Sequence, residues 1–371
     1  MRAAKRLYRS MTLNLISQVY RTPAIVNHFS SADWDKFIRQ GRRSGLLARM
    51  RDILAKNDQL DITPREARLH LDAAATLAEK QQIAVRWEIG KIIEALADLA
   101  FPVIALKGSA YVMAGLPSAS GRLFNDIDIL VPREFLGQVE AALMLAGWHP
   151  SRLSAYDDRY YRRWMHELPP MRHVNRATVI DVHHAILPDT ARHHPDSAKL
   201  RSRAVWIEGV KNLQVLAPED MLLHSATHLF HDGELPHGLR DLTDLDLLFR
   251  HFASIPDFWP KLQLRAQELA LERPLFYAMR YVQHFLATPI PENFERAIQP
   301  YASRKGVLAL MDAIFTRALA PEHVSCADAY TPLARKAAFI RAHWLRMPPY
   351  LLFPHLFHKA FIEPRYDPQT T

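Results

Sequence analysis

Two aspartates, Asp126 and Asp128, stand two residues apart in a segment that alternates acidic and apolar side chains. Alternate residues of a strand leave it on the same face, so a strand here places both carboxylates on one side. Ile127, Ile129 and Val131 then face the opposite way, into a core. Two adjacent carboxylates repel each other unless a cation joins them, and Mg²⁺ (or Mn²⁺) with oxygen ligands suits such a pair. The alternative is an exposed strand edge with two solvated acids.

Two further groups of residues favour the metal. Lys107, Gly108 and Ser109 form a predicted turn between a strand-like run and a helical stretch. Glycine lets a backbone approach phosphate closely, and a helix start that carries a hydroxyl is an anion site. Asp181 lies in a later strand-like segment with apolar neighbours. A third carboxylate beside the pair would bind a catalytic ion and accept the proton of an attacking hydroxyl.

The order of periodic patterns predicts the elements that position these residues. Residues 1–98 repeat apolar side chains every three to four positions, residues 99–215 hold the strand-like segments, and residues 216–371 are helical again. We therefore expect an α+β fold with a small mixed-sheet core between N-terminal helices and a C-terminal helical region. Those three ranges are the predicted domains.

Local signals refine this outline. Thr63 and Pro64 predict a helix start, with threonine as the N-cap and proline in the first position. The other predicted elements are a second helix that ends near Phe101, strands at 103–106 and 126–131, a helix at 133–147 closed by glycine, a hairpin around Asn175-Arg176, and helices beginning at Pro218 and spanning 239–252, 260–287 and 305–320.

Composition excludes several classes of protein. The chain has 371 residues, one cysteine, and 47 basic against 39 acidic residues for a net charge of +8. A single cysteine rules out a disulfide framework and favours a reducing, cytoplasmic location. No glycine-rich dinucleotide or P-loop motif occurs. The basic balance favours anionic partners, and no apolar run reaches the ~18 residues of a membrane span.

The motifs together resemble the nucleotidyltransferase superfamily that includes DNA polymerase β. The form found here, Leu106-Lys107-Gly108 followed by Arg122 and by Asp-Ile-Asp-Ile-Leu-Val at 126–131, is similar to the bacterial uncharacterised nucleotidyltransferase family. That family also has an acid-x-His strand, which Asp181-Val182-His183 matches. The similarity covers about residues 30–250. It implies transfer of a nucleoside monophosphate from a nucleoside triphosphate to an acceptor, with release of pyrophosphate.

The resemblance also implies a role for each matched acid. Asp126 and Asp128 would hold two Mg²⁺ or Mn²⁺ ions, and Asp181 would ligate one ion and orient or deprotonate the acceptor hydroxyl. The acceptor is not specified: a sugar, another small molecule, a protein hydroxyl and a tRNA end all remain open. Two rival functions also remain open. One is a non-catalytic nucleotide- or nucleic-acid-binding protein of the same fold, and the other is a membrane-surface accessory of polysaccharide assembly.

The matched basic and small residues would bind the triphosphate. Gly108 and Ser109 would cradle the β- and γ-phosphates, and Lys107 and Arg122 would offset their charge. Each basic residue has an alternative role, because Lys107 can be a surface charge at a strand end and Arg122 can pair with a nearby acid.

The resemblance implies that Arg240 and Asp244 face the active-site cleft, and His183 and His228 are the other two candidates for the acceptor cleft. Arg240 and Asp244 stand at i, i+4 and would equally form an intrahelical ion pair, which is the role we favour. His228 also lies four residues after His224, a spacing that can ligate zinc, although the glutamate of an H-E-x-x-H motif is missing.

The last part of the chain combines cations with aromatic side chains. Interleaved residues of these types bind nucleic acid or lie on a membrane surface, so membrane contact is an alternative. Prolines interrupt the pattern, and we expect a helix that packs on the core with its aromatic side chains inside. The residues are Arg335, Lys336, Arg341, Trp344, Arg346, Tyr350, Phe353, Phe357 and Phe361.

Overall fold

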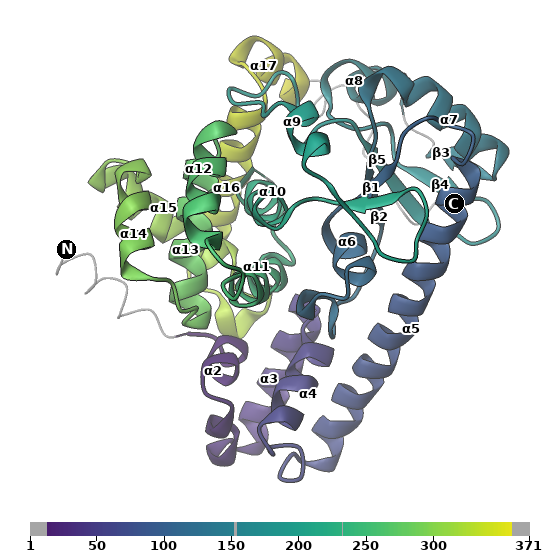
Figure 1. Cartoon of the computed structure of the whole chain (residues 1–371). Coiled ribbons are helices and arrows are strands. Elements are labelled where there is room, and N and C mark those ends of the chain that lie inside the picture. The colour runs from purple at the N-terminus through teal and green to yellow at the C-terminus, as the bar shows by residue number, and fades with distance from the viewer. Residues whose placement is uncertain (1–12, 152–153, 232, 358–371) are drawn as a thin grey trace.

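The N-terminal part of the chain is helical, as predicted (Figure 1). The computed structural model describes residues 13–151, 154–231 and 233–357. Ser30 caps one helix in a reciprocal capping box with Asp33, and Gly45 ends that helix in the left-handed conformation. The elements of this region are α2 (Leu15–Arg21), η1 (Pro23–His28), α3 (Ser31–Ser44), α4 (Leu47–Lys56) and α5 (Arg65–Ala95).

Helix α5 differs from its prediction in two ways. Thr63 is not the N-cap, because its hydroxyl donates 2.9 Å backwards to the carbonyl oxygen of Gln59 and Pro64 takes the cap position. The two helices predicted between 64 and 101 are one helix of 31 residues. No proline interrupts the chain between the two apolar patterns, so the backbone hydrogen bonds continue through both.

The middle of the chain forms the predicted mixed sheet, of seven strands in the order β3-β4-β5-β2-β1-β7-β6. Its α+β class is as expected. Strand β2 pairs antiparallel with β1 and parallel with β5, and the predicted hairpin pairs β4 with β5. The strands are β1 (Val103–Ala105), β2 (Ile127–Leu130), β3 (Trp148–Pro150), β4 (Met171–His173), β5 (Val179–His183), β6 (Val205–Trp206) and β7 (Leu213–Val215).

Helices of this region connect the strands. The segment 107–109, predicted as a turn, is instead the first turn of α6 (Lys107–Met113), with Lys107 at φ +46°. The helix predicted at 133–147 is a 3₁₀ turn followed by an α-helix, and Gly147 ends it at φ +99° as expected. The remaining elements are η2 (Pro117–Ala119), η3 (Arg133–Phe135), α7 (Leu136–Leu145), α8 (Ala155–Trp164) and α9 (Ser197–Ser202).

The C-terminal region is helical, and one predicted helix is divided. The pattern at 260–287 is two helices, because Ala270 adopts φ +55° between them and ends the first. The elements are α10 (Pro218–His231), α11 (Gly238–Phe252), α12 (Phe258–Glu268), α13 (Glu272–Leu286), α14 (Glu292–Ile298), η4 (Gln299–Tyr301), α15 (Lys305–Ala318), η5 (Val324–Cys326), α16 (Thr331–Arg346) and α17 (Pro349–Phe357).

The C-terminal aromatic side chains do not face inward, so that prediction is wrong. Helix α16 packs through a face of small residues, where Ala334, Ala338 and Ala342 are buried and let the backbone approach α10 and α15 closely. Trp344 is 56% exposed and Phe353 is 65% exposed. Phe361, the last aromatic residue of the pattern, lies outside the described residues.

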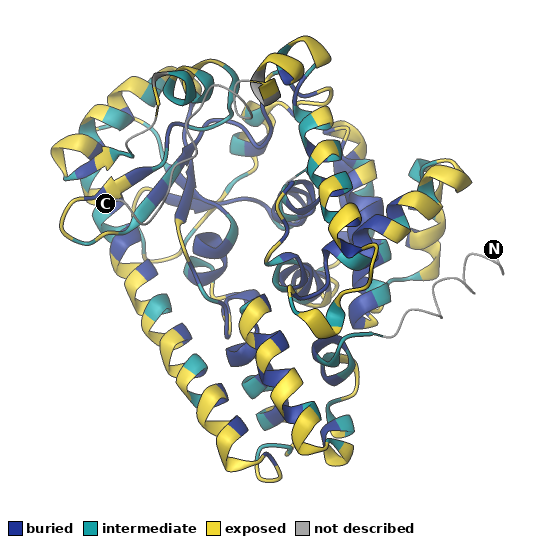
Figure 2. Cartoon of the chain, turned by 180° about the vertical axis from the view of Figure 1, so that it is seen from behind, coloured by how far each residue is buried: buried dark blue, intermediate teal, exposed yellow. Residues whose placement is uncertain are grey.

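One continuous cluster of buried apolar side chains joins the three regions. Figure 2 shows the central strands of the sheet and the central helices mostly in dark blue, whereas buried and exposed residues alternate along the outer helices. Helix α6 contacts both α5 and α10 beside the sheet, so it joins the strands to the helical regions (Figure 1). The predicted domain boundaries stay a prediction. No helix of the described residues has the length and apolar character needed to cross a membrane.

Candidate active site

The pairing of β2 with β5 brings the predicted acids together. The two strands are parallel, and their register places Asp128 beside Asp181. Register partners point to the same face of a sheet, and Asp126, two residues before Asp128, lies just ahead of β2 on that face. The alternate side chains of β2 are buried on the opposite face, as predicted. Two chain segments more than fifty residues apart therefore contribute carboxylates to one site.

Asp128 is the anchored member of this group. It is 3% exposed, and its Oδ1 lies 2.7 Å from Nζ of Lys107 and 3.0 Å from Nε2 of His183. Burial alone would raise the pKa of Asp128, but the ammonium of Lys107 and the hydrogen bond from His183 outweigh it and hold the pKa well below its usual range. Asp128 is therefore ionised at neutral pH and ready to bind a cation.

The pKa of Asp181 is shifted in the opposite direction from that of Asp128. Its Oδ1 is buried and has no hydrogen-bond partner among the described residues. Burial and repulsion from Asp128 and Glu167 raise the pKa of Asp181 to about 8. Asp126 is more exposed, yet partial desolvation by the surrounding protein and the charge of Asp128 raise its pKa as well. The site thus holds more carboxyl groups than its own cations can keep ionised, as sites that bind metal cations do.

The first turn of α6 lies against these acids. The hydroxyl of Ser109 is buried and has two backbone acceptors, the carbonyl oxygens of Leu106 at 2.7 Å and Asp128 at 3.0 Å. These hydrogen bonds link α6 to β2, and they use the hydroxyl proton of Ser109 within the fold. Gly108 has no room for a side chain, because a Cβ would collide with Nη1 of Arg122 and lie 2.8 Å from the ring of Phe124. The close approach of Arg122 therefore requires glycine at this position.

Arg122 is held by a buried ion-pair network. Its Nε lies 2.8 Å from Oδ2 of Asp244, and Nη1 of Arg49 lies 2.8 Å from the other carboxylate oxygen. The guanidinium also lies 5.1 Å from the ring centre of Phe124. All three charged side chains are at most 10% exposed. Arg122 therefore pairs with a nearby acid, one of its two predicted roles, and its role toward phosphate stays a prediction.

The predicted pair between Arg240 and Asp244 is wrong. Arg240 contacts its sequence neighbour Asp241 at 2.9 Å instead. The reason is that Asp244 turns inward and is already bound by two arginines. Arg240 nevertheless lies near the acids, because its positive charge, like that of Lys107, lowers the pKa of Asp126 and partly offsets the effect of burial.

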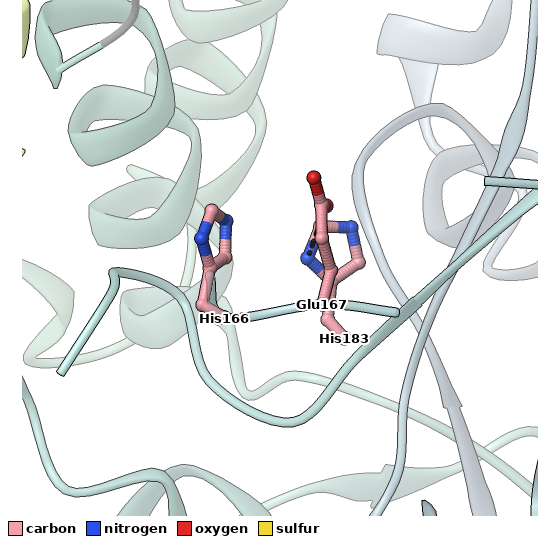
Figure 3. Close-up of side chains that lie close together, drawn as sticks. All are labelled: His166, Glu167 and His183. Atoms are coloured by element: carbon pink, nitrogen blue, oxygen red, sulfur yellow. Dashed lines mark ion pairs between the residues drawn. The ribbon is translucent and has the colours of Figure 1, made fainter. Parts of the chain in front are cut away.

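Two residues that the sequence analysis did not single out border the site. Oε2 of Glu167 lies 3.2 Å from Nδ1 of His183, and His166 lies next to it with its ring centre 5.3 Å from that of His183 (Figure 3). Burial and the charges of His183 and Lys107 lower the pKa of His166 well below its usual value. An isolated β-bridge between Glu167 and His183 sets this proximity. No spacing in the sequence indicates it, since the bridge forms only when the sheet is assembled.

The histidines of α10 face the same region. Burial and the charge of Lys107 lower the pKa of His224 to about 3, and the same causes lower that of His228. Both rings are therefore neutral at pH 7. Neither belongs to a group of three metal-ligating side chains within the described part of the chain, so the zinc alternative for this helix gains no support. The place of His228 in an acceptor cleft stays a prediction.

Comparison with known proteins gives one match. The sequence profile described as uncharacterised nucleotidyltransferase matches residues 30–287, which is more than half of the chain and includes every residue of the site. No curated protein and no solved structure matches.

Proposed function

The chain belongs to the uncharacterised nucleotidyltransferase family, and we propose that it transfers a nucleoside monophosphate from a nucleoside triphosphate to an acceptor hydroxyl with the aid of divalent metal ions. The observation that carries this proposal is the register of β2 and β5, which aligns Asp128 with Asp181 and leaves Asp126 on the same face. Three carboxylates of differing protonation on one face provide both oxygen ligands and a proton acceptor.

The donor set fits Mg²⁺ or Mn²⁺. Asp126, Asp128 and Asp181 offer hard oxygen atoms, and the buried Oδ1 of Asp181 lacks any other partner among the described residues. Bound ions would stabilise the charge that develops on the transferred phosphoryl group and on the leaving pyrophosphate. In the chain itself, Lys107 and His183 hold Asp128 in place, so that ligand is oriented before any ion arrives.

Asp181 is the proposed proton acceptor. The acceptor oxygen attacks the α-phosphorus, the new O–P bond forms as the bond between the α-phosphorus and the bridging oxygen breaks, and pyrophosphate leaves. The hydroxyl proton passes to Asp181. A pKa of about 8 in the metal-free protein means that Asp181 carries a proton near neutral pH, so bound metal ions would first displace that proton and leave a carboxylate able to accept the hydroxyl proton.

The triphosphate would lie along the start of α6. Lys107 is 17% exposed at its side chain, and Arg122 lies beside Gly108, where the missing side chain lets the backbone approach phosphate. Arg240 acts on the charge of Asp126 from α11. These three cations would neutralise charge on the phosphates, and the ion pair with Asp244 keeps Arg122 in a fixed position.

The test is direct labelling. The purified chain is incubated with each α-³²P-labelled nucleoside triphosphate, Mg²⁺ or Mn²⁺ and a cell lysate, and labelled products are separated by size. We expect a labelled product that is absent with the double variant Asp126→Asn/Asp128→Asn. Asp189→Asn is the matched control, because that carboxylate is 51% exposed in a surface ion pair.

Each outcome of the labelling experiment supports a different conclusion. The size of the product distinguishes a sugar or small-molecule acceptor from a protein or a tRNA end. Full transfer by a folded double variant would refute the mechanism. Metal-dependent nucleotide binding without any turnover would favour the non-catalytic nucleotide-binding alternative.

A cytoplasmic location fits the presence of one cysteine, Cys326, which is free.

A second candidate function has its own observation. Trp344, Tyr350, Phe353 and Phe357 are each more than half exposed at the end of α16 and on α17, in a region rich in arginine. Exposed aromatics with cations suit attachment to an anionic membrane surface. Flotation with anionic and neutral vesicles would test this, with Trp344→Ser/Phe353→Ser as the variant. Equal recovery of both proteins with the vesicles, or no recovery of either, would reject it.

A further inference from the structure

Three side chains beside the aspartates carry the ligand atoms of a different kind of metal site. Within the described residues, His166, Glu167 and His183 form the one group of three such side chains whose ligand atoms all lie within 4.8 Å of one another. The three predicted aspartates do not form so close a group. Figure 3 shows the two imidazoles and the carboxylate rising from neighbouring backbone segments to the same side.

The two imidazoles have unused nitrogen atoms. Nδ1 of His166 and Nδ1 of His183 are both buried and make no hydrogen bond within the described part of the chain. His183 is only 2% exposed, so water does not reach it freely. A buried polar atom without a partner costs free energy, and such atoms are rare unless a ligand completes them. Oε2 of Glu167 lies 3.2 Å from Nδ1 of His183 as an ion pair without an aligned hydrogen bond, so the nitrogen that has neither kind of partner among the described residues is Nδ1 of His166.

The other nitrogen of His183 has a firm partner. Nε2 lies 3.0 Å from Oδ1 of Asp128. Metal-ligating histidines ordinarily donate their second ring N–H to a carboxylate, which fixes the tautomer and turns the free nitrogen toward the ion. With Nε2–H directed to Asp128, Nδ1 of His183 faces the Glu167 carboxylate, and an ion bound at Nδ1 would take the place of the proton that this carboxylate favours there.

We propose that His166, Glu167 and His183 bind one first-row transition-metal ion, with Zn²⁺ as the best match to two imidazoles and one carboxylate. Two histidines and a glutamate with an open position are a known zinc ligand set. This ion is distinct from the Mg²⁺ ions assigned to the aspartates, because Mg²⁺ prefers oxygen ligands. Ligand atoms around tetrahedral Zn²⁺ lie roughly 3.3 Å apart for bonds of about 2.0–2.1 Å, so side-chain movements that shorten the separations from at most 4.8 Å by about 1.5 Å or less complete the site.

The ion would position the nucleotidyltransfer site. Ligation at Nδ1 locks the His183 ring with Nε2–H toward Asp128, and so fixes one of the proposed magnesium ligands. The positive ion also offsets the negative charge of Glu167 beside His183. His166, Glu167 and His183 are accordingly positioning residues, which act through Asp128 and not on the substrate.

The test measures metal content without any nucleotide. The purified full-length chain is loaded with Zn²⁺, dialysed against a weak chelator with excess Mg²⁺, and analysed for zinc by mass spectrometry. We expect one zinc per chain. His166→Ala and Glu167→Gln should each reduce zinc to below a tenth of that value. Replacement by Co²⁺ should give the visible absorption bands of a low-coordinate nitrogen–oxygen site, and both variants should abolish these bands.

Two matched variants separate this site from its neighbours. His224→Gln changes a buried histidine of α10 outside the group and should retain the zinc. Asp126→Asn removes a proposed magnesium ligand and should also retain it, whatever its effect on nucleotidyl transfer. Zinc that persists in folded His166→Ala and Glu167→Gln, zinc lost in His224→Gln, or no zinc bound by the parent chain would each overturn the proposal. Circular dichroism establishes folding, and if one variant fails to fold the other decides.

Discussion

Replacing Asp181 by asparagine is expected to stabilise the protein and to abolish its activity. The side chain lies among Asp126, Asp128 and Glu167, and its buried Oδ1 accepts no hydrogen bond from any described residue. Asparagine has almost the same shape, carries no charge and brings two N–H donors that can meet a neighbouring carboxylate. The same carboxylate that serves the proposed chemistry is therefore a source of instability in the metal-free chain.

The proton held by Asp181 sets the size of this effect. At pH 7 the folded chain keeps the carboxyl protonated, since its pKa is about 8, while the unfolded chain ionises it near 3.8. That difference spans roughly 3 pKa units at about 1.4 kcal/mol each, which gives a ceiling of about 4 kcal/mol. Because the side chain is only partly buried, we expect about 2 kcal/mol, or a rise of roughly 2–3 °C in the unfolding midpoint.

The sign of the pH dependence follows from the same values. A carboxyl whose folded pKa lies above its unfolded pKa contributes most favourably at low pH, and this contribution is lost as the pH rises from about 4 to about 8. The advantage of Asp181→Asn should therefore be small at pH 5 and large at pH 8.

The matched control is the same substitution at the register partner. Asp128→Asn removes a carboxylate that is paired with Lys107 and His183, and it leaves a nearly buried ammonium without its counter-ion. We expect a loss of about 3 kcal/mol. Thermal and urea unfolding at pH 5, 7 and 8, in the presence of a chelator, would measure both variants. A lowered midpoint for Asp181→Asn, or a gain that does not change with pH, would refute the reasoning.

Three other predictions follow from the same contacts. Gly108→Ala should displace the guanidinium of Arg122 from its buried ion pair, lower the unfolding midpoint and reduce kcat/KM for nucleotidyl transfer at least tenfold; an unchanged midpoint with unchanged kinetics would contradict the close contact. Asp244→Asn should cost about 3–5 kcal/mol in urea unfolding, because two buried arginines lose their counter-ion, whereas Asp35→Asn, in an exposed pair, should cost less than about 1 kcal/mol. Mg²⁺ affinity should increase with pH up to about 8, because binding must displace the proton of Asp181. Titration calorimetry at pH 7 in two buffers of different ionisation enthalpy should detect the released proton as a difference in binding heat. Equal binding heats in the two buffers would argue against this prediction.

The sequence was sufficient for the elements with a strong local signal. Alternation in 126–131 predicted strand β2 and the face of its acids, and a turn between two strand-like segments predicted the hairpin of β4 and β5. Local chemistry was less reliable at helix boundaries. Thr63 bonds backwards to a carbonyl oxygen, and Ala270 divides a helix that apolar periodicity alone leaves continuous. Neither event is encoded by residue spacing.

The same difference between local signals and tertiary contacts applies to the candidate site. Residue types and spacing predicted that Asp128 and Asp181 lie on strands and that Asp126, which precedes β2, shares the face of Asp128, because side-chain direction in a strand depends only on its two-residue period. The protonation of each aspartate depends instead on how the strands and helices pack together. Cross-strand register put Asp128 between Lys107 and His183 and left Asp181 without a partner among the described residues, which moves their pKa values in opposite directions.

Tertiary structure alone also brought Glu167 to His183, through a bridge between segments sixteen residues apart. It likewise turned Asp244 away from Arg240 and toward two distant arginines. The sequence by itself determined the three aspartates and the side on which the pair in β2 lies, because residue type and strand period are local properties. The fold decided their partners and their charges, because electrostatic energy depends on distances across the chain and on burial, and both arise only when separate segments pack together.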